Sequence, residues 1–374
     1  MIDLKSSVRR RIQERLDQFV NDGASAGAQL ALGFRDDSIG TFCSGIADPR
    51  NGIPVRSNTW FDLASLTKVI CTATWTMRAM QLSMIDLDQP IRIYLPQLRS
   101  RLRERTIRML LNHRSGLPPI FTNTQDVGSR EEKRRFFVTQ IDEAYQCEEE
   151  YPETVYSDVD FMLLGIILEQ VFHQRLETFF HESDGLFYKP TFGRGKVRGL
   201  LARTFPMGWV APILDLSEGA PWLQGLVQDP RARWFEGVSG HSGLFGTALG
   251  VERWARDLYM GFHGKSTFWS DKIVRRFLPL ETMALSDNDR FVQGFDRPSG
   301  VSQAGTLLPR ASTIGHLGYT GTSVWIDMES GMRISLLTHR FLPGIMPERL
   351  REVRPGIHDW LVGEVFSKLM WSYA

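Results

Sequence analysis

Apolar residues recur with clear periods at the N-terminal end of the chain. Over residues 7–21 they return every three or four positions, as on one face of an amphipathic helix; these residues are Val8, Ile12, Leu16 and Phe19. Two strand-like runs follow at 27–34 and 39–46, and the polar residues 35–38 between them suit a hairpin turn. This part of the chain is therefore predicted to form a helix and a β-hairpin.

The C-terminal end shows the same combination in reverse order. Residues 322–327 and 333–338 form a second pair of predicted strands, separated by Glu329-Ser330-Gly331. Over residues 357–373 apolar side chains again recur at helical spacing; they are Trp360, Leu361, Val365, Phe366, Leu369 and Met370. We therefore predict two strands and a closing helix.

The middle of the chain is predicted to be mainly helical. Helical patterns cover residues 65–82, 107–113, 159–172 and 251–260. Because predicted strands gather at both ends, the simplest arrangement is an α/β lobe formed by residues 1–64 and 240–374. Residues 65–239 then form an inserted, mainly helical lobe, and an active site is expected in the cleft between the two. Segment 179–236 is rich in Gly, Pro and aromatic residues and is expected to form loops on the cleft wall.

Charge and composition exclude some classes of partner. The chain of 374 residues has 44 basic and 43 acidic side chains, a net charge of +1. This balance gives no electrostatic reason to expect a nucleic-acid partner. No stretch reaches the roughly 18 continuous apolar residues of a membrane helix, so no membrane segment is expected.

The cysteines and the first residues bear on cellular location. The 3 cysteines, Cys43, Cys71 and Cys147, are odd in number and lack metal-like spacing, so free thiols are expected. The first ten residues contain no apolar core of signal-peptide length. We expect a cytoplasmic protein, with export of a longer precursor left open.

Ser65 and Lys68 form the first candidate for catalytic chemistry. They lie three positions apart at the start of a predicted helix, so Lys68 can reach the Ser65 hydroxyl. If burial lowers the pKa of Lys68, its neutral amine can accept the serine proton. The spacing alone is common by chance, and a capping serine followed by a solvated lysine is the alternative.

Two further segments could complete such a site. Tyr156 precedes Ser157 and Asp158 at the mouth of a helix, and a tyrosine placed against a lysine can act as a general base. Alternatively, Ser157 or Asp158 caps the helix and Tyr156 only packs against it. Residues 315–322 form a glycine-punctuated strand edge, which could present N–H groups to an acyl oxygen or could simply contain bulges.

In this order and at these separations, the three elements resemble the signature motifs of serine β-lactamases and penicillin-binding proteins. The tyrosine in the second element and the histidine in the third look more like class C β-lactamases and the esterases related to them. Segments 61–69, 110–118, 240–247 and 321–327 also look like family segments. The resemblance implies an α+β fold of the β-lactamase/transpeptidase type, with an antiparallel sheet flanked by the terminal helices and an inserted mainly helical lobe.

The resemblance also implies roles for individual residues. Ser65 would be acylated while Lys68 and Tyr156 share its proton. The backbone N–H groups of Ser65 and Tyr319 would form the oxyanion hole. The implied enzyme is a serine hydrolase that needs no cofactor or metal. Its substrate would be a small-molecule, peptide or muropeptide-like acyl donor; the oligomeric state is not predicted.

Four more positions are expected to contact substrate: Asp158, His316, Leu317 and Gly318. Asp158 stands where the family commonly has Asn, and its carboxylate could keep Lys68 protonated and shift the base role toward Tyr156. Leu317 stands where the family usually has a hydroxyl that helps to hold a substrate carboxylate. We therefore expect esters to be better substrates than β-lactams.

Other interpretations remain at this point. Residues 240–243 superficially resemble a hydrolase elbow around Ser242, but the second glycine comes one position early, so a structural turn is preferred. The 8 histidines show no metalloprotease spacing, and residues 193–195 are too short for a dinucleotide loop. A non-catalytic, penicillin-binding-like sensor or scaffold is the alternative to an enzyme.

Overall fold

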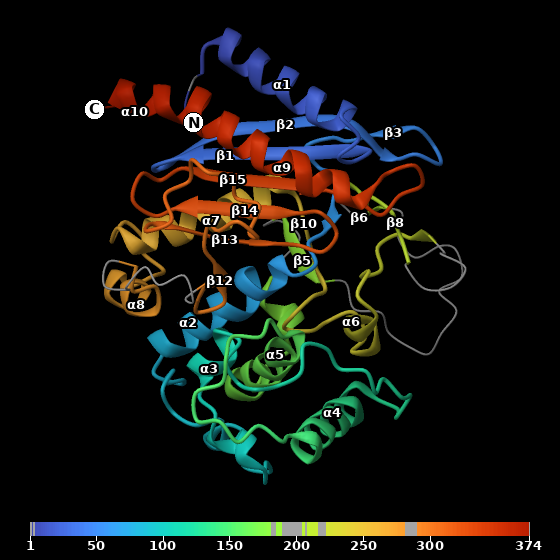
Figure 1. Cartoon of the computed structure of the whole chain (residues 1–374), viewed down its shortest axis with the longest axis vertical. Coiled ribbons are helices and arrows are strands. Elements are labelled where there is room, and N and C mark those ends of the chain that lie inside the picture. The colour runs from blue at the N-terminus through green and yellow to red at the C-terminus, as the bar shows by residue number, and fades with distance from the viewer. Residues whose placement is uncertain are drawn as a thin grey trace.

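A computed structural model describes residues 2, 4–180, 185–188, 204–205, 208–215, 222–280 and 290–373. One large antiparallel sheet of eight strands dominates it, in the order β11-β12-β13-β14-β15-β1-β2-β3 (Figure 1). In chain order its strands are β1 (Gly27–Phe34), β2 (Asp37–Asp48), β3 (Ile53–Pro54), β11 (Phe291–Val292), β12 (Phe295–Asp296), β13 (Thr313–Leu317), β14 (Ser323–Asp327) and β15 (Arg333–Thr338). The predicted strands at both ends of the chain are confirmed.

Strands from the two ends of the chain meet in the centre of this sheet. β1 pairs with β15 in antiparallel register, with Ala28 opposite Thr338 and Gly33 opposite Arg333. On its other edge, β1 pairs with β2 across the predicted hairpin. The burial of every β1 residue explains the nearly continuous apolar run in the sequence.

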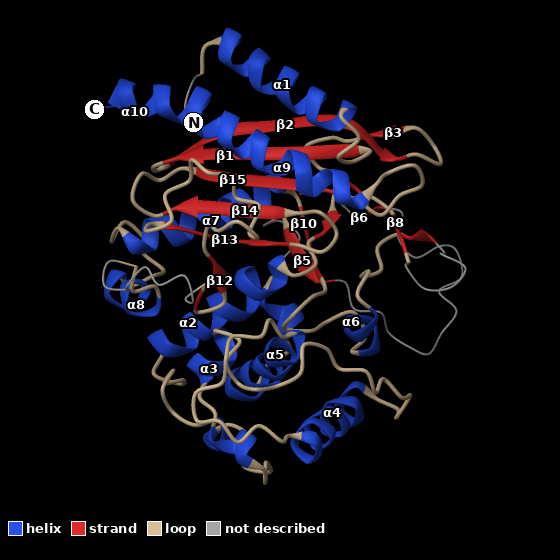
Figure 2. Cartoon of the chain, in the orientation of Figure 1, coloured by secondary structure: helices blue, strands red, loops and turns tan. Residues whose placement is uncertain are grey.

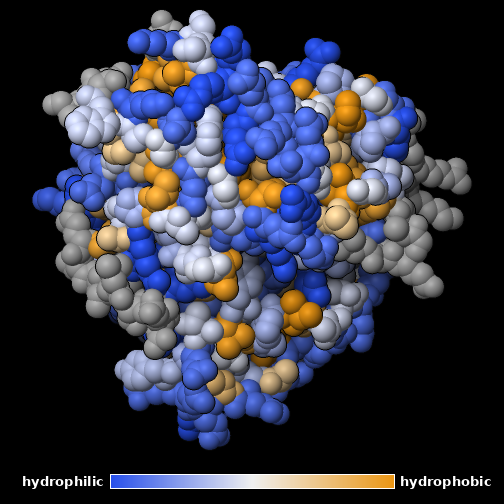
Figure 3. Space-filling model, turned by 45° about the horizontal axis from the view of Figure 1, so that its top comes forward, coloured by the Kyte–Doolittle hydropathy of each residue, from blue (hydrophilic) through white to orange (hydrophobic). Residues whose placement is uncertain are grey.

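The terminal helices cover one face of the sheet (Figure 2). They are α1 (Ser6–Asn21) and α9 (Pro347–Leu361), which continues through residues 362–366 into α10 (Ser367–Tyr373). Their apolar faces pack with the sheet into a cluster that we call the outer core; it includes Ile12, Leu16, Phe19, Leu350, Ile357 and Phe366. Figure 3 shows a mostly hydrophilic surface on the side where these helices come forward, as expected for amphipathic helices.

The C-terminal helix begins at Pro347, so the predicted start at residue 357 is wrong. Proline is tolerated in the first turn of a helix, because the N–H that it lacks would have no partner there. Pro355 lies inside the helix, where the sequence alone suggests an interruption. The surrounding outer core, with Leu350 fully buried, stabilises the extra turns.

Helices on the other side of the sheet build a second, larger core. They are α2 (Thr74–Gln81), α3 (Ile107–Leu111), α5 (Asp158–Phe172), α7 (Ala248–Phe262) and α8 (Asp271–Phe277), with a π-helical turn at Lys68–Ala73 before α2. Short 3-10 turns lie at Ile91–Ile93, Arg101–Glu104 and Leu176–Phe179. This arrangement confirms the predicted α+β fold class. The exact lobe boundaries at 64/65 and 239/240 stay a prediction.

Helix α4 (Arg130–Ala144) is an element that the sequence pattern did not predict. Ser129 and Glu132 form a capping box at its start, which satisfies the first N–H groups. Arg134 contacts Glu169 of α5, and its side chain is only 17 % exposed. Arg130 also pairs with Glu169, at 2.8 Å, and these ion pairs fasten α4 to the lobe.

A small sheet carries the chain into the candidate site. It contains β4 (Phe61–Asp62), β10 (Leu244–Gly246) and β5 (Leu186–Tyr188), with β10 in the middle. The short pairs β6 (Thr204–Phe205) with β7 (Gly208–Trp209), and β8 (Ile213–Leu214) with β9 (Trp222–Leu223), lie in segment 179–236, followed by α6 (Pro230–Trp234). Most of residues 181–221 lie outside the described part of the chain, so the loop prediction there is largely untested. Among the described residues, none of the helices is long and apolar enough to span a bilayer.

Candidate active site

Ser65 lies in a tight turn directly after β4. The preceding Ala64 has a positive φ of 46°, a conformation that costs a residue with a side chain on the order of 1–3 kcal/mol and is often found at functional sites. The buried Asp62 holds this turn: its carboxylate accepts hydrogen bonds from the N–H of Ala64 (2.9 Å) and of Gln228 (2.7 Å). The Thr320 hydroxyl donates to the Asp62 carbonyl (2.7 Å), which ties the turn to the third sequence element.

Lys68 lies in the π-helical turn and its side chain is completely buried. Its Nζ is 3.0 Å from Ser65 Oγ and 2.7 Å from Asp158 Oδ1. Burial opposes the charge of Lys68, but the carboxylate of Asp158 and the hydroxyl of Tyr156 outweigh it and raise the pKa of Lys68. The expectation that burial gives a neutral amine is therefore wrong. The alternative, in which Asp158 keeps Lys68 protonated, agrees with the structure.

Asp158 is ionised in this arrangement. Burial favours its neutral form, but the Lys68 ammonium outweighs burial and lowers the pKa of Asp158 below 3.8. Asp158 begins α5, whose N-cap is Ser157: the Ser157 hydroxyl accepts from the Asp160 N–H at 3.2 Å. The capping interpretation is thus correct for Ser157, and it leaves Asp158 directed at Lys68.

Tyr156 stands directly beside Lys68, with 4.8 Å between Lys68 Nζ and the ring centroid. Burial raises the pKa of Tyr156 and outweighs Lys68 and Ser65, which lower it. The ring packs between His113 and His316, with centroid distances of 4.6 and 6.0 Å, and 36 % of the residue remains exposed. Tyr156 is therefore a neutral phenol at neutral pH, suited to donate a proton.

His316 on β13 is buried and neutral. Burial lowers the pKa of His316 to about 3. Its Nδ1 lies 2.7 Å from the carbonyl of Leu317, so Nδ1 carries the proton, while Nε2 has no partner among the described residues. His316 therefore supplies no positive charge for a substrate carboxylate.

Leu317 and Gly318, the two residues after His316, both have packing roles. Leu317 is half-buried and packs against the outer core, and its contact with substrate stays a prediction. A Cβ atom on Gly318 would lie 2.0 Å from Thr322 Oγ1 and 2.7 Å from the Leu63 carbonyl oxygen, which only glycine avoids. Its N–H donates to the Thr322 carbonyl at 2.7 Å, closing the turn before β14.

Two backbone N–H groups match the predicted oxyanion hole. Ser65 and Tyr319 line the same cavity, and neither N–H has a hydrogen-bond acceptor among the described residues. Unpaired donors next to a nucleophile are what a developing oxyanion requires. Their role as the oxyanion hole remains a prediction.

The cavity around Ser65 has a volume of about 490 Å³. Its wall also contains residues that sequence analysis did not assign, namely Asp229, His241 and Ser242. Asp229 Oδ1 lies 3.0 Å from His241 Nε2. The Ser242 hydroxyl is buried without a described partner, so no base activates it and the elbow interpretation has no support. The pairing of β4 with β10, and the hydrogen bond from Thr72 Oγ1 to the Gly240 carbonyl (2.6 Å), bring residues 240–243 next to Ser65.

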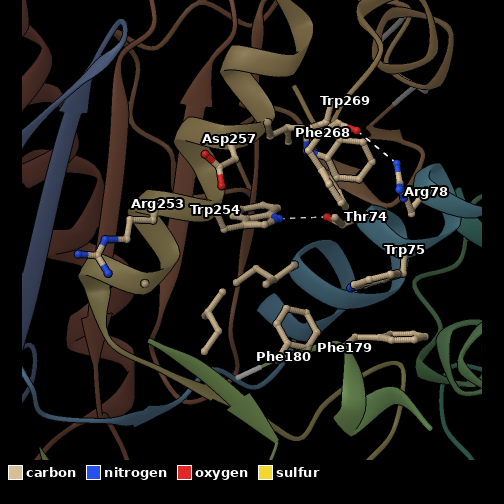
Figure 4. A pocket seen from close by; sticks show the side chains of 14 residues that line it. Thr74, Trp75, Arg78, Phe179, Phe180, Arg253, Trp254, Asp257, Phe268 and Trp269 are labelled. Atoms are coloured by element: carbon tan, nitrogen blue, oxygen red, sulfur yellow. Dashed lines mark hydrogen bonds between the residues drawn. The ribbon is translucent and has the colours of Figure 1, made fainter. Parts of the chain in front are cut away.

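A second cavity, of about 400 Å³, lies between α2 and α7 (Figure 4). Aromatic side chains dominate its wall: Trp75, Phe179, Phe180, Trp254, Phe268 and Trp269. The Trp254 indole donates to Thr74 Oγ1 at 3.0 Å, and Arg78 donates to the Phe268 carbonyl at 3.2 Å. None of the candidate catalytic residues lines it.

The antiparallel sheet, with Ser65 in contact with the buried Lys68, defines the class of a serine hydrolase with a Ser-x-x-Lys element. The β-lactamase family model matches residues 9–355. The chain belongs to the β-lactamase family, and the resemblance drawn from the sequence is confirmed.

Relatives within this fold have diverse activities. The chain is 28 % identical to an N-acetylmuramyl-L-alanine amidase of Bacillus subtilis (strain 168), over 82 % of this chain and 74 % of the relative. It superposes on EstCE1, a hydrolase with promiscuous acyltransferase activity, with a TM-score of 0.69 and 19 % identity, covering 94 % and 98 % of the two chains. For the D-amino acid amidase of Ochrobactrum anthropi SV3 the TM-score is 0.65 at 21 % identity, with coverages of 96 % and 99 %. The two structural matches support the fold and leave the substrate open.

Proposed function

We propose that this protein is an acyl hydrolase in which Ser65 forms a covalent acyl-enzyme with an ester or amide. The observation that carries the proposal is the unbroken line of hydrogen-bond distances from Ser65 Oγ to Lys68 Nζ (3.0 Å) and on to Asp158 Oδ1 (2.7 Å). These distances are within the range needed for direct proton transfer.

The charge states indicate how the proton moves. As Ser65 Oγ bonds to the acyl carbon, its proton passes to Lys68, and Lys68 passes one of its protons to Asp158. The carbonyl electron pair moves onto oxygen, which the N–H groups of Ser65 and Tyr319 stabilise. Collapse of this intermediate breaks the bond to the leaving group, and the neutral Tyr156 hydroxyl protonates that group. Lys68 then returns a proton to Tyr156, and Asp158 returns its proton to Lys68.

Water completes the cycle by attacking the acyl carbon. The same groups take its proton, the bond to Ser65 Oγ breaks, and Ser65 recovers its hydrogen. Each group therefore ends the cycle in its starting charge state.

Esters and amides are proposed as better substrates than β-lactams. A β-lactam carries a carboxylate, and the neutral His316 offers it no charge. One missing charge-assisted hydrogen bond is worth about 1.5–3 kcal/mol, or roughly ten- to a hundredfold in acylation. The burial of His316 thus adds a second reason to the one predicted from the apolar Leu317.

Burst kinetics with p-nitrophenyl acetate and butyrate test the proposal. The wild type should release a burst of p-nitrophenol equal to the enzyme concentration, followed by steady turnover, because acylation precedes hydrolysis. Ser65→Ala should lose both phases, whereas Ser57→Ala, at an exposed serine, should keep them. A stoichiometric burst without turnover would instead support the sensor alternative, and an unchanged Ser65→Ala enzyme would refute the proposal.

A further inference from the structure

The wall of the Ser65 cavity formed by residues 229–242 presents unused hydrogen-bond acceptors. Asp229 caps α6, and its Oδ1 accepts from the N–H groups of Arg231 and Ala232 (2.8 Å each) and from His241 (3.0 Å). Its other oxygen, Oδ2, has Arg231 Nη1 at 3.7 Å, which is too long for a hydrogen bond. Asp229 lines the cavity with 19 % of its side chain exposed.

Asp158 also has a carboxylate oxygen without a hydrogen-bond partner among the described residues. Its Oδ1 accepts from Lys68, while Oδ2 has no partner among the described residues and 18 % of the side chain is exposed. A carboxylate oxygen of Asp158, one of Asp229 and a ring nitrogen of His241 lie within 4.8 Å of one another. Two ionised carboxylates thus converge beside Ser65.

Ser242 supplies an independent observation, a buried hydroxyl at this wall that has no described partner. It is 3 % exposed, it lines the cavity, and its hydroxyl has no hydrogen-bond partner in the described structure. A buried hydroxyl without a partner is costly. A ligand group placed here would satisfy it.

The chemistry of the cluster favours an ammonium group over a metal ion. Ionised Asp229 can only accept, so His241 Nε2 must carry the hydrogen between them; His241 Nδ1 lies 2.9 Å from Ser239 Oγ. Both ring nitrogens are therefore occupied, and His241 cannot be a metal ligand. Two carboxylates and one hydroxyl provide acceptors for the three N–H donors of an ammonium.

The positively charged side chains in or next to the cavity do not prevent an ammonium group from binding, because each already has its own partners. Lys68 is paired with Asp158. Arg233 donates to Asp215 and to the carbonyls of Val227 and Gln228. Arg231 donates through Nε to the Phe121 carbonyl.

We propose that the Ser65 cavity selects acyl donors with a free ammonium group next to the scissile carbonyl, as in amino-acid amides and the N-terminal residue of peptides. Asp158, Asp229 and Ser242 bind this group. The inference rests on the proposed acyl-hydrolase function and names its substrate class.

The test compares phenylalanine p-nitroanilide, using the faster enantiomer, with 3-phenylpropionyl p-nitroanilide, which lacks only the amine. The measured quantity is the ratio of their kcat/KM values, which is independent of the fraction of folded enzyme. At pH 6 we expect a ratio on the order of 10 to 100, as for charge-assisted hydrogen bonds. At pH 9 the ratio should fall, because the α-amine loses its proton near pH 7.7–8.0.

Variants separate binding of the ammonium from its electronic effect on the carbonyl. Asp229→Asn, which keeps the helix cap, and Ser242→Ala should each lower the pH 6 ratio about tenfold; Asp271→Asn, at an exposed site, should not. Turnover of both anilides with a ratio near 1 at pH 6, or ratios unchanged in both variants, would overturn the inference alone. No turnover of either anilide or of p-nitrophenyl acetate would overturn the proposed function as well.

Discussion

The two cavities of this molecule are similar in size but differ in chemistry. The Ser65 cavity, about 490 Å³, collects Ser65, Tyr156, Asp158, Asp229 and His241. The cavity between α2 and α7, about 400 Å³, is lined mainly by aromatic side chains (Figure 4). Size alone therefore does not mark the active site. Convergent titratable groups with shifted pKa values do.

The backbone shows the same difference. At Ser65 the chain adopts a turn with a positive φ at Ala64, held by Asp62 and Thr320. At the aromatic cavity, Trp75 and Trp254 project from the regular helices α2 and α7. Of the two regions, only the first has a strained conformation next to its candidate nucleophile. Substitutions should therefore affect catalysis strongly in the first region and stability in the second.

Lys68→Ala should give the largest catalytic loss short of removing the nucleophile. It removes the group that contacts both Ser65 and Asp158, so kcat/KM for a p-nitrophenyl ester should fall on the order of 10³-fold. Lys272→Ala, at an exposed lysine on α8, is the matched control and should have no effect. A Lys68→Ala enzyme within tenfold of the wild type would contradict the proton path.

Tyr156→Phe should lower kcat/KM on the order of 10²-fold by removing the proton donor for the leaving group. The loss should be smaller for p-nitrophenyl esters than for alkyl esters, because p-nitrophenolate leaves without protonation. Paired kinetics on both ester types measure this difference. If kcat/KM falls equally for both ester types, Tyr156 only packs in the site and does not donate the proton.

Asp158→Asn should change the shape of the pH–rate profile. In the wild type the carboxylate must be ionised, and because the pKa of Asp158 is lowered, the rate should fall only as the pH drops below about 4. Without the carboxylate, Lys68 itself must be neutral to accept the proton. The variant rate should then be on the order of tenfold lower at pH 7 and should rise with pH. A pH–rate profile parallel to that of the wild type would contradict the proposal that Lys68 and Asp158 together act as the base.

Trp254→Phe in the aromatic cavity should have the smallest catalytic effect, within about threefold in kcat/KM. It removes the hydrogen bond to Thr74, and should lower the free energy of unfolding by about 1 kcal/mol. Urea denaturation and ester kinetics on the same preparation measure both quantities. A large loss of activity without a loss of stability would show that the two cavities are coupled.

The sequence predicted those parts of the molecule whose patterns are local. The strands 27–34 and 333–338 follow from their apolar runs, and α1 follows from its helical period. Helix α4 was missed, because ion pairs to Glu169 and the Ser129 cap stabilise a segment with a weak apolar face. The capping box is a local pattern, but the ion pairs to Glu169 exist only after the chain folds.

In the candidate site, too, some residues follow from local sequence patterns and others depend on the folded structure. Ser65, Lys68 and Tyr156 were found from motif spacing, and the structure brings them together. Asp229 has no local signal, because its place in the cavity depends on its contact with His241. For Ser242 the local pattern suggested only a hydrolase elbow, which the structure does not support. The charge state of Lys68 depends on its 2.7 Å distance from Asp158. The packing of Leu317 depends on helices distant in sequence.

The central claim is that Ser65 is the nucleophile of this molecule. Incubation with a fluorophosphonate probe, followed by tryptic digestion and mass spectrometry, tests it most directly. We predict one adduct per chain, located on Ser65 and absent from Ser65→Ala. An adduct on Ser242, or labelling that persists in Ser65→Ala, would contradict the claim.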